Sequence, residues 1–190
     1  MRLFAALPVP GDARAALERL TGGLRDAEWP VRWVRGEGLH LTLKFYGEVA
    51  PSLERPLAEA LRGAAGGTPP LDLCATQVDC FPNARRARVI VATLEAPAAL
   101  ELLQDGIERA SAALGFEPEG RAFRPHVTLG RVRQGGRLPA GAEARLQALK
   151  PDIAFLAEEV VLYESTPAAG GSRYEPRAVV PLVHPTAAAR

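Results

Sequence analysis

The 190-residue chain has few of the residues from which disulfides, metal sites and base-stacking surfaces are usually built. It contains two cysteines, three histidines and 6% aromatic residues. No apolar run approaches the ~20 residues that a membrane span requires, and no glycine-rich phosphate loop is present. The opening MRLFAALPVPGD is too short and too broken by proline for a signal peptide. We therefore expect a soluble, cytoplasmic protein.

The two cysteines are unsuited to a disulfide. Cys74 and Cys80 lie on one expected strand, separated by roughly 20 Å at ~3.3 Å per residue. A disulfide requires Cα atoms within about 7 Å of each other. Both thiols should therefore be free, as is usual in a reducing compartment. With no histidine nearby they also make a poor metal site, and we expect no metal and no cofactor.

An excess of charge of one sign is also missing, because 23 basic and 22 acidic residues leave a net charge of +1. A general role in binding polyanions is therefore not implied. Locally the balance differs, since residues 120–150 contain seven cations and one acid, Glu143. A second basic group consists of Arg85, Arg86 and Arg88. A local positive field suits a phosphate-bearing ligand, although a solvated arginine-rich face has the same composition.

Hydrophobic periodicity predicts one α+β domain over residues 1–190. The expected strands are Arg2–Leu7, Leu39–Tyr46, Leu71–Phe81, Ala87–Leu94, His126–Val132, Ile153–Tyr163 and Tyr174–Leu182. The expected helices are Gly11–Leu24, Ser52–Arg62, Pro97–Leu114 and Ala142–Ala148. Each half of the chain has a long helix, a loop and then a strand beginning His-x-Thr. This likeness predicts a bilobal fold, with two similar lobes around a central cleft.

The chain carries the same short pattern twice, as HLTL at residues 40–43 and HVTL at residues 126–129. Side chains two residues apart on a strand point the same way. His40, Thr42 and Lys44 should therefore share one face toward the cleft. By the same rule, the other face of the first strand should bury Leu41, Leu43 and Phe45.

Two histidines flanking one phosphorus can hydrolyse a phosphodiester without a metal. One ring takes a proton from water and the other gives a proton to the leaving oxygen, because histidine titrates near neutral pH. We expect His126 to be the base and His40 the acid. The hydroxyls of Thr42 and Thr128 can hold the non-bridging oxygens as charge shifts.

Arg131 would add a fixed charge and a forked donor to this site. Simple alternation puts Arg131 on the face opposite His126, whereas a bulge at Gly130 would turn it toward the cleft. We include Arg131 among the substrate-binding residues. The third histidine, His184, lacks a motif and is expected to be a surface residue near the C-terminus.

Longer segments around the two motifs resemble the bacterial and archaeal RNA 2′,3′-cyclic phosphodiesterases, also called 2′-5′ RNA ligases, of the 2H phosphoesterase superfamily. The resemblance rests on RLFAALPVP, WVRGEGLHLTLKFYGEV, FPNARRARVIVATL, FRPHVTLGRVR and VVLYESTPAAGGSRYEP. The paired His-x-Thr motifs are typical of the superfamily, and the WVR, FRPH and LYES segments of the family. The sequence departs from the family at Thr166, where an apolar residue is common.

The resemblance implies a duplicated 2H phosphoesterase-like fold with two antiparallel-rich sheets, outer helices and both motifs in the cleft. It implies hydrolysis of RNA 2′,3′-cyclic phosphate ends to 2′-phosphates, with weak 2′-5′ ligation. His40 and His126 match the catalytic positions, and the substrate-binding positions match Thr42, Thr128, Arg131 and Phe45. Phe45 matches an aromatic position that contacts a base, which conflicts with its burial by alternation. Tyr163, in LYES, has either a site role or a packing role. We expect a monomer.

Three other interpretations remain open from the sequence. An RNA-binding module without catalysis would explain the basic segment, although such modules usually expose more aromatic residues. A metal-dependent hydrolase would need carboxylates or further histidines beside the motifs, and neither motif supplies them. The same fold acting on 2′-5′ oligoadenylates or cyclic nucleotide-sugar phosphates fits the motifs equally well.

Overall fold

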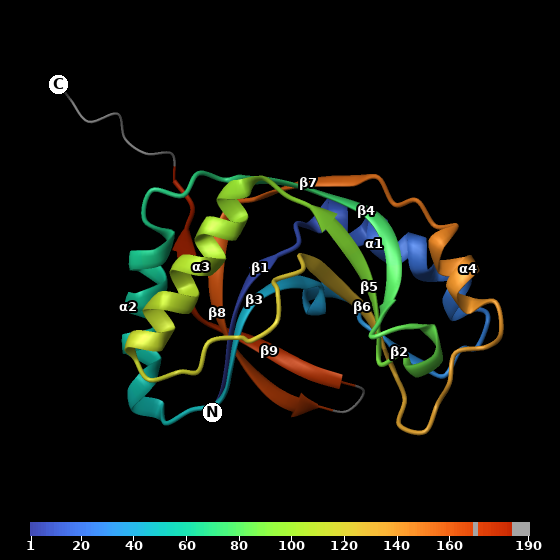
Figure 1. Ribbon diagram of the computed structural model, residues 1–190, viewed down its shortest axis with the longest axis horizontal. Helices are drawn as coiled ribbons and strands as arrows, with labels where there is room; N and C mark the ends of the chain where they lie inside the picture. The colour runs from blue at the N-terminus through green and yellow to red at the C-terminus, as the bar shows by residue number, and fades with distance from the viewer. Residues whose placement is uncertain (169–170, 184–190) are drawn as a thin grey trace.

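The computed structural model describes residues 1–168 and 171–183, and His184 lies outside this range. Within it, nine strands form one antiparallel sheet (Figure 1). These strands are β1 Arg2–Pro8, β2 Val31–Trp33, β3 His40–Glu48, β4 Leu71–Phe81, β5 Val89–Glu95, β6 His126–Val132, β7 Ile153–Ala157, β8 Glu159–Ala168 and β9 Gly171–Pro181. The helices are α1 Gly11–Arg25, α2 Glu54–Ala65, α3 Ala98–Ala113 and α4 Ala142–Gln147, with 3-10 turns at Gly36–Gly38, Pro51–Leu53 and Ala84–Arg86.

The sheet consists of two halves that meet at its centre. Its order is β7-β4-β5-β6-β3-β1-β8-β9, and β2 adds to β6. Most neighbouring strands pair over several residues, whereas β3 and β6 are joined through the single pair Leu41 and Val127. The two sheets expected from the sequence are therefore halves of one continuous sheet, and the α+β fold class is confirmed.

Helices cover both halves, and two of them pack on the half opposite to the strand that precedes them in the chain (Figure 1). Helix α1 follows β1 in the chain but contacts β7 of the other half, where α4 packs on β4. Helix α3 follows β5 but contacts β3 of the opposite half, where it lies beside α2. On α3 the buried residues Leu100, Leu103 and Ile107 recur at helical spacing, which explains why this face packs.

Most expected elements agree with the observed ones to within a few residues, and two differ. The segment Ile153–Tyr163, expected as one strand, is divided at Glu158 into β7, which pairs with β4, and β8, which pairs with β1. Those partners lie in opposite halves, so the chain has to cross between them. The second difference is β2, whose three residues are too few to show alternation.

Two further expectations concern features away from the sheet. Cys74 and Cys80 both lie on β4 as free thiols, as predicted. Gly115 follows the end of α3 with a φ of +88°, the left-handed conformation expected for a glycine that ends a helix. None of the helices in the described residues combines the length and apolar character needed to cross a membrane.

Candidate functional site

The two His-x-Thr motifs pair with each other at the centre of the sheet. Leu41 and Val127, the middle residues of the motifs, lie opposite each other, and both side chains are buried. In an antiparallel register this places His40 opposite Thr128 and Thr42 opposite His126. These four side chains are partly exposed on the other face. The sequence repeat therefore becomes one compact polar cluster with approximate two-fold symmetry.

A bulge in β3 changes the face of the residues after the first motif. Ala6 pairs with Thr42 and Ala5 with Lys44, so Leu43 is an extra residue in this strand. The alternation resets there, which makes two expectations wrong. Lys44 is buried on the side of α3 instead of facing the cleft with His40, and Phe45, expected in the core, is 50% exposed.

A matching bulge in β6 turns Arg131 onto the face of the histidines. Val91 pairs with Thr128 and Ile90 with Gly130, so Leu129 is the extra residue. At Gly130 a Cβ atom would lie 2.6 Å from Cγ1 of Val31, so only glycine fits beneath β2 there. The bulge anticipated from Gly130 is therefore present, and the side chain of Arg131 is exposed.

His126 is held by a backbone carbonyl. Its Nδ1 lies 2.7 Å from the carbonyl oxygen of Arg124. Because a carbonyl only accepts hydrogen bonds, Nδ1 carries a proton, and in the neutral ring Nε2 is the free acceptor. The ring also stands edge-on to Phe81, with centroids 5.4 Å apart. His126 therefore presents a defined nitrogen toward the cleft.

His40 occupies a more buried position. Its pKa is lowered from 6.5 to about 4, mainly by burial and also by the nearby charges of Arg131 and His126, whereas the carbonyl of Gly38 acts in the opposite direction. Nδ1 of His40 is nevertheless buried without a hydrogen bond of acceptable geometry. The ring is therefore neutral at pH 7 in the free protein.

Aromatic side chains surround His40. Its ring centroid lies 4.8 Å from that of Phe4, 5.2 Å from that of Tyr174 and 6.3 Å from that of Tyr163. Phe4 also stacks on Phe45 with centroids 6.5 Å apart. Tyr163 belongs to the LYES segment, for which the sequence indicated a site role or a packing role. Nothing in the sequence distinguished Phe4 or Tyr174 from ordinary core residues.

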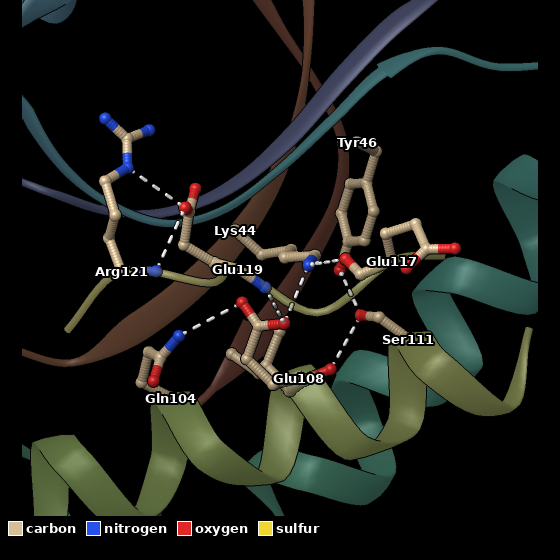
Figure 2. Close-up of polar contacts among 9 residues, drawn as sticks. Lys44, Tyr46, Gln104, Glu108, Ser111, Glu117, Glu119 and Arg121 are labelled. Atoms are coloured by element: carbon tan, nitrogen blue, oxygen red, sulfur yellow. Dashed lines mark hydrogen bonds and ion pairs between the residues drawn. The ribbon is translucent and has the colours of Figure 1, made fainter. Parts of the chain in front are cut away.

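Lys44 connects the first motif strand to the segment that leads into the second (Figure 2). Its Nζ donates to Oε2 of Glu108 on α3 and to the carbonyl of Glu117, each at 2.7 Å. The Glu108 carboxylate also accepts hydrogen bonds from Gln104 and from the backbone N–H of Glu119. This buried network fixes the loop after α3, from which the chain continues to His126.

In residues 1–168 and 171–183, no group of three or more histidine, cysteine, aspartate or glutamate side chains is arranged to hold a metal. The residues gathered at the cluster are instead side chains that can hydrogen-bond to an anion. The hydroxyls of Thr42 and Thr128, the guanidinium of Arg131 and the two imidazoles can all bind phosphate oxygens.

Comparison with known proteins gives consistent matches. Residues 7–91 and 93–174 match the model of the LigT like Phosphoesterase family. An RNA 2′,3′-cyclic phosphodiesterase of Geobacillus stearothermophilus is 32% identical over 185 residues, which cover 95% of this chain and 57% of the relative. The chain therefore spans little more than half the length of that relative.

Solved structures agree with this result. A crystal structure of a Thermus thermophilus protein has a TM-score of 0.80 and 25% identity, covering 97% of this chain and 99% of the other. The crystal structure of Escherichia coli LigT complexed with 3′-AMP has a TM-score of 0.73 and 26% identity, covering 95% and 97%. The residues matched to the family include both His-x-Thr strands, and the chain belongs to the LigT-like phosphoesterases, the family within the 2H phosphoesterase superfamily that its sequence resembles.

Proposed function

We propose that this protein opens 2′,3′-cyclic phosphates at RNA 3′ ends to leave 2′-phosphates, by metal-independent acid–base catalysis with His40 and His126. The supporting observation is the register of the two motifs, which sets each histidine opposite the threonine of the other motif on one face of the sheet. The names of the relatives support the same substrate class.

The reaction requires one bond to form and one to break at phosphorus. A water oxygen attacks the cyclic phosphate, one histidine accepts the water proton, and the bond between phosphorus and the 3′-oxygen breaks. The other histidine donates a proton to that oxygen, so charge and protons balance. Each such proton transfer contributes typically 10²–10⁴-fold to the rate. Thr42, Thr128 and Arg131 hold the non-bridging oxygens while negative charge shifts in the transition state.

The lowered pKa of His40 bears on which histidine is the base. A ring that is neutral at pH 7 accepts a proton more readily than it donates one. Burial therefore favours His40 as base and His126 as acid in the free protein, the reverse of the order expected from the sequence. The sequence-based order requires the bound phosphate anion to raise the pKa of His40.

The same geometry accommodates ligation. If the 5′-hydroxyl of a second RNA strand takes the place of water, the same two proton transfers produce a 2′-5′ phosphodiester. Hydrolysis should dominate in dilute solution, because water is far more concentrated than any RNA end.

The test is turnover of a nucleoside 2′,3′-cyclic phosphate in excess EDTA, with the product identified by ³¹P NMR. We expect the 2′-phosphate, and a loss of about 10²-fold or more in kcat for His40→Ala and for His126→Ala. The double variant should lose much less than the product of the two single losses, because the pair acts as a unit.

Several outcomes would contradict this proposal. Activity abolished by EDTA and restored by a divalent cation would indicate a metal-dependent hydrolase. RNA binding without turnover would indicate a binding module, and selective cleavage of 2′-5′ oligoadenylates would indicate the alternative substrate class. Near-normal turnover by either single histidine variant would remove the paired acid–base role.

A further inference from the structure

A pocket lies beside the histidine cluster, next to β2. It is a pocket of about 270 Å³ whose lining includes Arg32, Trp33, Arg35, Arg131 and Tyr174. It is continuous with the cluster, because Arg131 belongs to both and the Tyr174 ring contacts that of His40 at 5.2 Å. A ligand bound at the histidines therefore has this pocket as its immediate neighbour.

The pocket concentrates positive charge. Arg32 on β2 lies directly opposite Arg131 on β6, and like charges at directly opposed positions destabilise a sheet. Within residues 1–168 and 171–183, none of the ion pairs includes Arg32, Arg35 or Arg131. These guanidinium groups face solvent without a carboxylate to offset their mutual repulsion.

Glu37, in the turn after Arg35, is exposed and takes part in none of the ion pairs of the described residues, whereas Glu18 is engaged elsewhere. Glu18 accepts a hydrogen bond from the backbone N–H of Gly36 at 2.5 Å, and its charge acts on Arg25 of the same helix. A larger pocket of about 550 Å³ along α2 differs in this respect, because its arginines are paired with acids, Arg55 with Glu59 and Arg177 with Glu54. The arginines beside the histidines are arranged to receive an anion from outside the protein.

The chemistry of the substrate decides which anion this is. An RNA that ends in a 2′,3′-cyclic phosphate has no nucleotide on the 3′ side of that group. A second phosphate of the same strand therefore lies on the 5′ side of the terminal nucleotide. Forked guanidinium groups bind phosphate oxygens through two parallel hydrogen bonds, which suits a phosphodiester.

We propose that Arg32 and Arg35 form a second phosphate subsite, which binds the phosphate immediately 5′ to the nucleotide that carries the cyclic phosphate. The inference rests on the proposed function and deepens it by naming the substrate class. The protein then prefers oligonucleotides, and 5′-phosphorylated nucleoside cyclic phosphates, over nucleoside cyclic phosphates that lack a second phosphate.

The test compares kcat/KM for three substrates at fixed ionic strength: adenosine 2′,3′-cyclic phosphate, the same compound with a 5′-phosphate, and a dinucleotide that ends in it. We expect the unmodified protein to favour the last two by about tenfold or more, the size of one charge-assisted hydrogen bond. In the Arg32→Gln/Arg35→Gln double variant, the ratio of kcat/KM for these two substrates to kcat/KM for adenosine 2′,3′-cyclic phosphate should fall toward one. Arg109→Gln removes the same charge from the exposed face of α3 in the other half and should keep the preference.

Each result has a distinct meaning. If the unmodified protein had equal kcat/KM for all three substrates, the subsite would be overturned while the hydrolysis itself remained intact. The same conclusion would follow if the double variant kept the preference of the unmodified protein. An equal loss on all three substrates in the double variant would also overturn it, because the arginines would then support the reacting phosphate or the fold. No turnover of any substrate by the unmodified protein would contradict the proposed function and this inference together.

Discussion

His40 has surroundings that differ strongly from water. It lies among Phe4, Tyr163 and Tyr174, and burial rather than any single charge is the main reason for its low pKa. Removing water from an imidazole favours the neutral ring. The same burial makes protein stability sensitive to pH.

The first prediction concerns that sensitivity. The pKa of His40 is about 4 in the folded protein against 6.5 for the unperturbed group. Its neutral state stabilises the fold fully above about pH 6.5, and this contribution is lost as the pH falls toward 4, because the unfolded chain binds the proton first. The loss amounts to at most ~3 kcal/mol in the free energy of unfolding.

Urea denaturation of the unmodified protein and of His40→Gln, measured from pH 7 to pH 4, checks this prediction. The unmodified protein should lose stability more steeply across the window than the variant does. Parallel stability curves for the two proteins would mean that His40 titrates normally in the folded state.

The second prediction concerns Arg131, which the bulge in β6 turns toward the cleft. Arg131→Lys keeps the charge but loses the planar fork that binds two phosphate oxygens. We expect kcat/KM to fall by about tenfold or more, equivalent to ~1.4 kcal/mol of transition-state stabilisation. Arg109→Lys on α3 is the matched control, and equal activity of the two variants would show that the fork does not contact the phosphate.

At the scale of elements, both motif strands have a bulge directly after the His-x-Thr segment. The extra residues are Leu43 in β3 and Leu129 in β6. A bulge changes which face the following side chains occupy. It exposes Phe45 and Arg131 and buries Lys44, so each strand carries polar groups on the cleft side and still anchors its end in the core.

The third prediction tests the buried ion pair that results. Lys44→Met leaves the Glu108 carboxylate largely buried without its cation, and breaking such a pair typically costs about 3–5 kcal/mol. The double variant Lys44→Met/Glu108→Leu removes both charges and should recover most of that loss. Guanidinium denaturation measures both changes. A double variant as unstable as Lys44→Met would mean that the hydrogen bond from Lys44 to the Glu117 carbonyl is the main contribution.

At the scale of the whole molecule, the sheet and the helices both join the two halves. The sheet itself is continuous through one residue pair, Leu41 and Val127. Helix α1 contacts β7, and α3 contacts β3, each on the half opposite to the strand that precedes it in the chain. Neither half therefore has a complete core of its own.

The fourth prediction is that the chain unfolds in one cooperative step. Trp33 pairs with β6, and Trp29 lies under Arg145 of α4, which packs on β4 of the same half. Tryptophan fluorescence therefore reports on one half, whereas far-ultraviolet circular dichroism reports on all the helices. The two signals should give the same denaturation midpoint. Separate midpoints would show that the halves unfold independently, contrary to the single domain expected from the sequence.

Much of the fold and the centre of the site could be predicted from the sequence because they depend on local pattern. The four helices follow from their apolar spacing, and Gly115 ends α3 where its conformational freedom is needed. The duplicated His-x-Thr pattern indicated that both strands present the same polar face. These features are repeated or periodic, and a single chain displays them directly.

Tertiary structure alone decided the features that depend on how strands align with their neighbours. Alternation placed Lys44 in the cleft and Phe45 in the core, and the bulge at Leu43 reversed both. Which half each helix covers, and the aromatic surroundings of His40, depend on residues that are far apart in the chain. Gly130 indicated the bulge in β6, whereas the bulge at Leu43 is defined only by the alignment of β3 with β1. The sequence therefore determined which polar residues recur in the two motifs, and the packing determined which way the residues after them face.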